Sequence, residues 1–125
     1  MIAGSRRCLV VDDSRVVRKV ARRILEGQGC DVTETENGAE ALAACHKALP
    51  DCVLLDWYMP VMNGLAFLQA LRAAFGPDKP LVIFCTMEND AAQISLACAH
   101  GAQGYIVKPF DADMLIGKFT QLGLL

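Results

Sequence analysis

Residues 52–68, CVLLDWYMPVMNGLAFL, indicate the fold class of this 125-residue chain. Apolar residues lead directly into Asp56, which is typical of a strand buried on both faces of a sheet. Asn63-Gly64 then predicts a turn, and the apolar stripe over residues 65–75 predicts a helix. The stretch is therefore a predicted strand–loop–helix unit with a carboxylate at the end of its strand.

Similar units lie on both sides of this one. Further apolar runs predict strands at 7–11, 30–35, 81–86 and 104–108, and helical patterns predict helices at 14–29, 37–49, 89–100 and from about residue 111. The second strand is the most polar, so we expect it at a sheet edge. Strands alternating with helices predict an α/β fold, in which a parallel sheet is covered on both faces. We expect a doubly wound, flavodoxin-like sheet of five strands in the common order 2-1-3-4-5.

The length of 125 residues predicts a single domain over residues 1–125, and we expect this domain to be reduced and to have no effector domain beside it. A hydrophobic content of 54% supports an aliphatic core, and a formal charge of −2 argues against a nucleic-acid binder. The six cysteines are widely spaced with no C-x-x-C pair, so we expect free thiols and no structural zinc. Neither a secretory leader nor an apolar run of about 20 residues is present, and we expect a cytoplasmic protein that does not enter a membrane.

Polar side chains stand at the ends of four predicted strands. Asp12 and Asp13 follow the first, Asp56 ends the third, Thr86 ends the fourth and Lys108 ends the fifth. Parallel strands connected by right-handed crossovers have their carboxyl ends at one edge of the sheet, where ligands of such folds bind. In the order 2-1-3-4-5 the first and third strands are neighbours, so the three carboxylates should converge.

Three converging carboxylates repel one another unless a cation neutralises them. A set of oxygen ligands favours a hard divalent cation, and we predict Mg²⁺ held by Asp13 and Asp56. A carboxylate can attack a phosphoryl group to form an acyl phosphate, and the metal and Lys108 would neutralise the transferring oxygens. The hydroxyl of Thr86 would then bind a phosphoryl oxygen on Asp56. The added charge would make the site a switch.

These motifs resemble those of response-regulator receiver domains of two-component signalling. The resemblance covers nearly the whole chain and is carried by VVDDS, ENGAEAL, LLDWYMPVMNG, CTM and YIVKPF, in the order and spacing of that family. It implies transfer of a phosphoryl group onto Asp56 from a histidine kinase or a histidine phosphotransfer protein. It also implies a phosphoacceptor with slow self-catalysed phosphorylation and dephosphorylation, and not an enzyme acting on a separate substrate.

The resemblance assigns further roles within this pocket. Asp13 matches a direct metal ligand, Asp12 a ligand acting through water, and the backbone carbonyl of Tyr58 the remaining protein ligand. Thr86 matches the switch hydroxyl, Lys108 the lysine that contacts phosphate, and Tyr105 the aromatic switch residue, although a half-buried strand aromatic is an equal interpretation for Tyr105. The bond between Lys108 and Pro109 matches one that is usually cis in the family.

Three residues are expected to tune the lifetime of the phosphoryl group. Tyr58, Met87 and Glu88 flank the predicted site, and the position of Met87 is usually small in the family because it borders the phosphoryl entrance. A flexible methionine can narrow that entrance or move aside. Trp57, beside Asp56, is interpreted as a packing residue whose fluorescence should report binding.

The expected output is phosphorylation-dependent binding of another protein by a monomer. The fourth helix, fifth strand and fifth helix form the candidate face, with Ile94, Ala97, Tyr105 and Lys118 as candidate contacts. The basic residues of the first helix are interpreted as solvated surface, with kinase docking as the alternative; they are Arg15, Arg18, Lys19, Arg22 and Arg23.

Other functions stay open at this point. A phosphatase with an aspartyl-phosphate intermediate commonly needs a second carboxylate two positions after the nucleophile, where this chain has Tyr58. A flavin or nucleotide binder needs a glycine-rich phosphate cradle, where this chain has Asp12-Asp13-Ser14. A receiver-shaped adaptor that is never phosphorylated is kept open by Met87.

Overall fold

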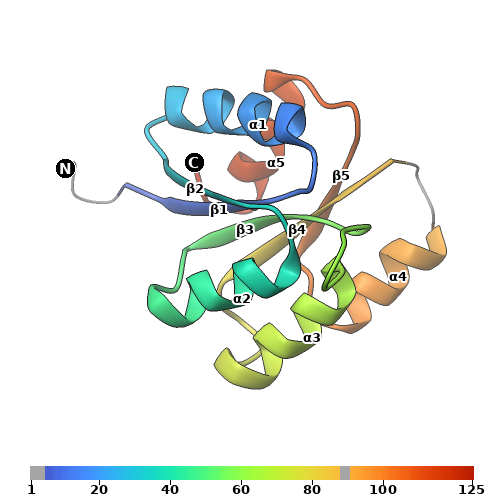
Figure 1. Cartoon of the computed structure of the whole chain (residues 1–125). Coiled ribbons are helices and arrows are strands. Elements are labelled where there is room, and N and C mark those ends of the chain that lie inside the picture. Colours follow the sequence, from blue (N-terminus) through green and yellow to red (C-terminus); the bar gives the residue numbers. More distant parts are fainter. Residues whose placement is uncertain (1–4, 88–90) are drawn as a thin grey trace.

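The computed structural model describes residues 5–87 and 91–125, and within these ranges it contains one five-stranded parallel sheet and five helices (Figure 1). Along the chain the elements are β1 (Arg7–Val11), α1 (Arg15–Gly27), β2 (Asp31–Thr35), α2 (Gly38–Lys47), β3 (Cys52–Asp56), α3 (Gly64–Phe75), β4 (Leu81–Thr86), α4 (Ala91–Ala99), β5 (Gly104–Val107) and α5 (Ala112–Gln121). The strand order is β2-β1-β3-β4-β5, so the predicted fold class and topology are confirmed, as is the edge position of the second strand.

Helices cover both faces of the sheet. In Figure 1, α1 and α5 lie on one side, and α2, α3 and α4 lie on the other. The alternation of side chains along β1 explains the two cores: Cys8 and Val10 pack with residues of α1 and α5, whereas Leu9 and Val11 pack with residues of α2 and α3. The central strands β3 and β4 are covered on both faces and are nearly continuous apolar runs, whereas the edge strand β2 is largely polar.

The ends of the first helix follow from its capping residues. The Ser14 side chain accepts a hydrogen bond of 3.3 Å from the backbone N–H of Val17, and thus caps the N-terminus of α1. After the helix, Gly29 has a φ of +85°, a left-handed conformation that glycine adopts without steric cost. The predicted range of 14–29 therefore includes its capping residues, and β2 begins at Asp31, one residue later than expected.

Several other predicted boundaries are shifted by one or two residues. The second helix ends at Lys47, earlier than predicted, and Asn37 is its N-cap because its side chain accepts a hydrogen bond from the N–H of Glu40. The third helix begins at Gly64, one residue early, after the capping Asn63. The fourth spans Ala91–Ala99, and part of its predicted start lies outside the described residues.

The fifth strand ends at Val107, so the prediction that it extends to residue 108 is wrong by one residue. The N–H of Lys108 still donates to the carbonyl of Thr86 at 2.6 Å, but Pro109 has no N–H and cannot continue the ladder. The peptide bond between Lys108 and Pro109 is cis, as the family resemblance implied, and Lys79-Pro80 is also cis.

Two predictions from composition can be checked on the described part of the chain. All six cysteines are free, and five of them are buried, with Cys98 exposed. Among the described residues, no helix combines the length and apolar character needed to cross a bilayer.

Candidate functional site

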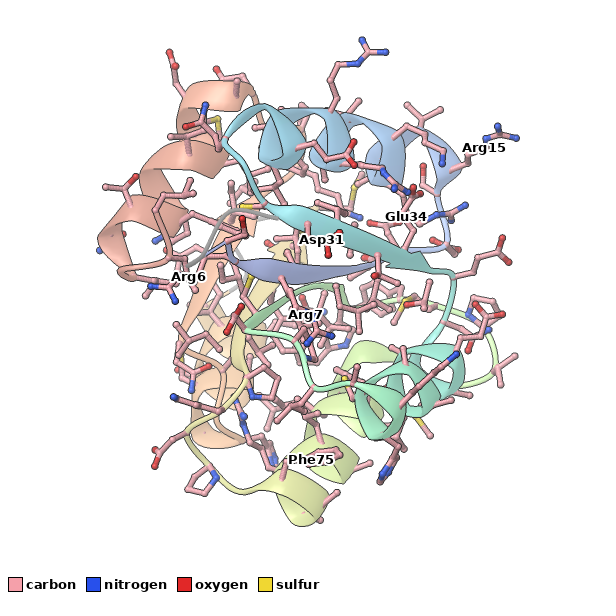
Figure 2. All side chains as sticks on the ribbon, turned by 90° about the vertical axis from the view of Figure 1, so that its left-hand side faces the viewer. Arg6, Arg7, Arg15, Asp31, Glu34 and Phe75 are labelled. Carbon is pink, nitrogen blue, oxygen red and sulfur yellow. The ribbon has the colours of Figure 1, made fainter. Side chains whose placement is uncertain are left out.

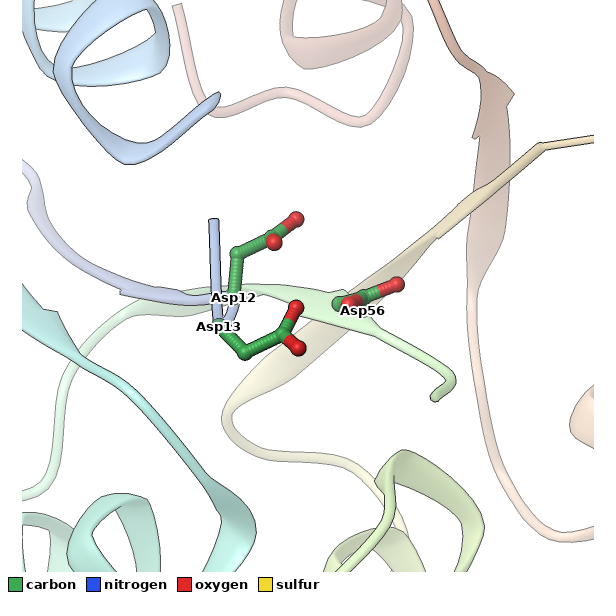
Figure 3. A group of neighbouring side chains, drawn as sticks. All are labelled: Asp12, Asp13 and Asp56. Atoms are coloured by element: carbon green, nitrogen blue, oxygen red, sulfur yellow. The ribbon is translucent and has the colours of Figure 1, made fainter. Parts of the chain in front are cut away.

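The carboxyl ends of β1 and β3 bring three aspartates together. Val11 pairs with Leu55 in the parallel register, so Asp12 follows β1 beside the position where Asp56 ends β3. Carboxylate oxygens of Asp12, Asp13 and Asp56 lie within 4.8 Å of one another (Figure 3). Among the described residues, this is the one group of three or more acidic, histidine or cysteine side chains arranged closely enough to hold a metal ion. The predicted convergence is confirmed.

Lys108 lies between two of these carboxylates. Its Nζ is 2.7 Å from Oδ2 of Asp12 and 3.1 Å from Oδ1 of Asp56. Asp12 and Asp56 are buried, at 2% and 7% exposed, whereas Asp13 is exposed. Burial acts to lower the pKa of Lys108, but its hydrogen bond and charge interaction with Asp12 raise it, so the ammonium form is favoured. One cation therefore faces three carboxylates.

Asp56 is the carboxylate that this imbalance affects most. Burial and the negative charge of Asp12 raise its pKa to about 6, although Lys108 acts in the opposite direction. A divalent cation would remove the repulsion, and the donor set consists of oxygens, which suits a hard ion such as Mg²⁺. The residues present therefore fit a metal of this class.

The local contacts of the acidic pair give its members different surroundings. Oδ1 of Asp12 accepts a hydrogen bond of 2.9 Å from the backbone N–H of Ser14, and Oδ2 is bound to Lys108. Within residues 5–87 and 91–125, no side chain makes a hydrogen bond or ion pair with the Asp13 carboxylate. The expectation that Asp13 contacts a metal directly and Asp12 acts through water stays a prediction.

The loop after β3 returns close to the strand end. The N–H of Gly64 donates to the carbonyl of Trp57 at 2.8 Å, and a Cβ at residue 64 would collide with the carbonyl oxygen of Asp56. Trp57 is 8% exposed, with its ring centroid 5.0 Å from that of Phe84, so the predicted packing role is confirmed. Val61 has a φ of +69°, which is unusual for a β-branched residue.

Thr86 and Tyr105 occupy neighbouring strands on the other side of Asp56. Asp56 pairs with Cys85, so the buried Thr86 is the next residue along β4. Tyr105 on β5 is half-buried, and Nζ of Lys118 lies 5.6 Å from its ring centroid. Both positions suit the expected switch pair, whose function stays a prediction.

Two of the three residues expected to tune phosphoryl lifetime, Tyr58 and Met87, are exposed. The Tyr58 ring is 68% exposed, and its hydroxyl oxygen accepts a hydrogen bond of 2.6 Å from Nε2 of Gln93 on α4. Met87 is 70% exposed, and Glu88 lies outside the described residues. The sequence pattern did not predict the contact between Tyr58 and Gln93, because it joins a loop to a helix 35 residues away.

An open groove adjoins the pocket. It has a volume of about 300 Å³ and is lined by Val16, Val17, Val20, Met87, Lys108, Pro109 and Phe110. Val16 and Val20 on α1 are 73% and 43% exposed, so an apolar surface reaches from the first helix to Lys108.

Two sequence interpretations are wrong. Arg18 was placed on a solvated basic face of α1, but it is 8% exposed and its Nη1 donates to the carbonyl of Asp12 at 2.8 Å. Its spacing to Ala21 and Leu25, which are both buried on the same helix, was the available signal. Ala97 was a candidate surface contact, but it is 4% exposed because this face of α4 packs against the sheet.

Comparisons with known proteins agree with this geometry. A family model described as the response regulator receiver domain matches residues 8–120. The DNA-binding response regulator MtrA of Mycobacterium tuberculosis (strain ATCC 25618 / H37Rv) is 35% identical over 112 residues, which cover 90% of this chain and 48% of that protein. The chain thus spans about half the length of the curated relatives it matches first.

Solved structures are similar over nearly the whole chain. The chemotaxis response regulator CheY4 of Vibrio cholerae superposes with a TM-score of 0.89 at 31% identity, covering 94% of this chain and 98% of that one. The response regulator domain of Thermotoga maritima CheB gives a TM-score of 0.84 at 29% identity, covering 94% and 95%.

Proposed function

This chain belongs to the response regulator receiver family, and we propose that it accepts a phosphoryl group on Asp56 in a Mg²⁺-dependent reaction and signals by phosphorylation-dependent protein binding. The observation that carries the proposal is the convergence of three carboxylates, two of them buried, with the single ammonium group of Lys108. The clustered negative charge favours binding of a divalent cation, and that cation together with Lys108 would neutralise the oxygens of an incoming phosphoryl group at this ligand-binding edge of the sheet.

The phosphodonor is a phosphohistidine of a sensor kinase or of a histidine phosphotransfer protein. A carboxylate oxygen of Asp56 attacks the phosphorus, a P–O bond forms as the P–N bond breaks, and the histidine nitrogen keeps the electron pair of the broken bond. Asp13, Asp56 and the backbone carbonyl of Tyr58 would hold Mg²⁺, with Asp12 acting through water, and the metal would supply positive charge for the phosphoryl oxygens. Lys108 and the hydroxyl of Thr86 donate hydrogen bonds to the product.

Asp56 returns to its free carboxylate by slow attack of water on the phosphorus of the acyl phosphate, which breaks the P–O bond to Asp56 and releases inorganic phosphate. Tyr58 stands two residues after Asp56, where a carboxylate would be expected in a phosphatase that activates water. A phenol is a poor base at neutral pH, because its usual pKa is about 10. The chain therefore functions as a phosphoacceptor whose lifetime depends on access past Tyr58 and Met87, and not as an enzyme with a separate substrate.

Labelling with a small phosphodonor such as acetyl phosphate tests this function. Intact mass should increase by one phosphoryl group in the presence of Mg²⁺, and not after addition of EDTA. Asp56→Asn should take no label, whereas Asp78→Asn, a matched change at an exposed site, should label like the parent. An unlabelled parent would favour the adaptor that is never phosphorylated, and a labelled Asp56→Asn would place the acceptor elsewhere.

We propose that the phosphodonor protein docks on the exposed apolar surface of α1 beside the pocket. Val16, Val20 and Met87 border the groove that ends at Lys108, and a docked histidine would thus lie near Asp56. Exposed basic residues follow the same helix and would attract an acidic partner; they are Arg15, Lys19 and Arg23.

Separate phosphodonors can test this docking surface. Val16→Asp should slow transfer from a cognate protein donor by about tenfold, since an apolar interface residue would become charged. Labelling by acetyl phosphate should not change, because that donor needs no docking surface. Leu49→Asp, at an exposed apolar position beyond the C-terminus of α2, is the control. Equal slowing with both donors would indicate damage to the pocket instead.

The proposed output face comprises α4, β5 and α5. Ile94, Tyr105 and Lys118 are half-buried on it, and Leu96 and Met114 are each 42% exposed. Fluorotyrosine NMR of Tyr105, recorded with Mg²⁺ before and after beryllofluoride, tests the switch. An unchanged signal for Tyr105 would assign it a packing function only.

A further inference from the structure

Arg18 is buried in α1 at a position where most charged residues would be exposed. It lies on the helix face of Ala21 and Leu25, and its side chain is only 10% exposed. A guanidinium is rarely buried unless its donors are bound, and here they are. Nη1 donates to the backbone carbonyl of Asp12 at 2.8 Å, and Nε donates to Oε1 of Glu34 at 3.2 Å.

Glu34 on β2 fixes the direction of this guanidinium. In Figure 2, which views the molecule from the β2 edge, Glu34 lies toward the same end as Arg15 at the start of α1. Its carboxylate also binds Nζ of Lys19 and Nη1 of Arg22, each at 2.8 Å, and its side chain is 11% exposed. A carboxylate bound by three cations has little freedom to rotate, and this restricts the orientation of the Arg18 guanidinium.

The hydrogen bond from Arg18 to the carbonyl of Asp12 constrains the peptide unit that joins Asp12 and Asp13. Because a peptide unit is planar, the orientation of the Asp12 carbonyl also sets the orientation of the N–H and Cα of Asp13. The N–H of Asp12 is itself bound to the carbonyl of Thr35 at 3.2 Å. The peptide units on both sides of Asp12 are therefore tied to β2, one directly and one through Arg18 and Glu34.

We propose that Arg18 is a positioning residue for the metal site, holding the Asp12–Asp13 peptide so that both carboxylates face Asp56. This inference rests on the proposed Mg²⁺-dependent function, but it assigns Arg18 and Glu34 a part in it, although neither touches the metal or the phosphoryl group. Partners that orient metal ligands typically contribute about 10- to 100-fold in metal affinity.

The positive charge of Arg18, considered alone, predicts the opposite effect of its removal on Mg²⁺ affinity. Loss of a cation near a metal site should strengthen Mg²⁺ binding if only the electrostatic field mattered. Loss of a positioning contact should weaken it. The sign of the change therefore separates the two explanations, and for this reason Arg18 is a sharper target than Glu34, whose removal would weaken binding through either cause.

The test is a Mg²⁺ titration followed by the emission of Trp57, at a temperature where thermal melts show each variant to be folded. Arg18→Gln should raise the Mg²⁺ dissociation constant about tenfold. Arg22→Gln is the matched control, because Arg22 contacts Glu34 but not Asp12. Arg22→Gln should have a Mg²⁺ dissociation constant within twofold of the parent value or slightly lower. Isothermal titration calorimetry gives a second measure that does not depend on fluorescence.

The outcomes are distinguishable. Unchanged or tighter binding by Arg18→Gln, or equal weakening in Arg18→Gln and Arg22→Gln, would overturn the inference while leaving the proposed function in place. A parent that does not bind Mg²⁺ would overturn both. If Arg18→Gln does not fold, Arg18→Lys and Arg22→Lys replace the pair. Lysine cannot bridge Asp12 and Glu34 as a planar fork does, so Arg18→Lys should bind several-fold more weakly and Arg22→Lys like the parent.

Discussion

Two carboxylates near the same edge of the sheet, the buried Asp56 and the partly buried Glu34, have opposite surroundings. Asp56 shares its pocket with two further carboxylates and one ammonium group, whereas Glu34 accepts hydrogen bonds from three cationic side chains. Burial and Asp12 raise the pKa of Asp56 to about 6. Burial also acts to raise the pKa of Glu34, but hydrogen bonds from Lys19 and Arg22 lower it to about 2.

This difference in charge environment distinguishes two clusters. The structural cluster is Glu34 with its three cationic partners, and the proposed functional cluster is Asp56 with Asp12, Asp13 and Lys108. Glu34 is stabilised as an anion by contacts already present, and it ties α1 to β2. Asp56 is left with unfavourable negative charge that a divalent cation can relieve, so cation binding is favoured there. Arg18 joins the two clusters, because it contacts both Glu34 and the backbone of Asp12.

The largest expected effect comes from breaking the structural cluster. Glu34→Gln should lower the free energy of unfolding by about 2–3 kcal/mol, because the buried Arg18 would lose its charged partner. Urea denaturation at pH 7 measures this. Glu36→Gln is the control: the Glu36 side chain is 66% exposed and 3.7 Å from Arg18, so its loss should change stability by less than about 0.5 kcal/mol. Equal losses of stability in Glu34→Gln and Glu36→Gln would contradict the structural role assigned to Glu34.

Removing a negative charge from the functional cluster should change the free energy of unfolding in the opposite direction, toward greater stability. Asp56→Asn should stabilise the metal-free protein by about 2 kcal/mol at pH 7, measured by urea denaturation in EDTA. A carboxyl group whose folded-state pKa is raised binds its proton more tightly in the folded protein. Its penalty is therefore present above about pH 6 and disappears as pH falls below the unfolded value, so the advantage of Asp56→Asn should vanish near pH 4. A destabilised variant would contradict the interpretation.

The affinity for Mg²⁺ should depend on the protonation of Asp56 over the same pH range. Metal and proton compete for Asp56, whose pKa is about 6 without metal, so the Mg²⁺ dissociation constant should rise about tenfold between pH 7 and pH 5. Trp57 emission measures this. A constant affinity over that range would mean that Asp56 is not a ligand.

The smallest effect tests for strain beside Asp56. Val61 has a φ of +69° and is 84% exposed in the loop after β3. Val61→Gly should stabilise the fold by about 0.5–1 kcal/mol, since relief of the left-handed penalty exceeds the added entropy of glycine in the unfolded chain. Thermal melts measure the gain, and Val61→Ala, which keeps a Cβ, should show less of it. No gain from glycine would show that the loop carries no such strain.

The sheet and the acidic pocket could be predicted because both follow from short-range patterns. Apolar runs mark the buried strands, and parallel connectivity alone places Asp12 and Asp56 at one edge. The spacing of Arg18 to Ala21 and Leu25 places it on the buried face of α1, but its burial as a charged residue also depends on Glu34, a residue from another element. A helical pattern assigns charged residues to solvent unless the partner that neutralises them is known. The burial of Ala97 was missed because alanine suits either face of a helix.

Helix α1 carries separate tasks on its two sides. The inward positions hold Arg18 against Asp12, whereas Val16 and Val20 are turned outward beside the groove. Residues on neighbouring turns of one helix can thus be substituted independently, by protein engineers or during natural divergence. Under the docking proposed for α1, substitutions at Val16 and Val20 would change partner binding and leave the contact between Arg18 and Asp12 in place.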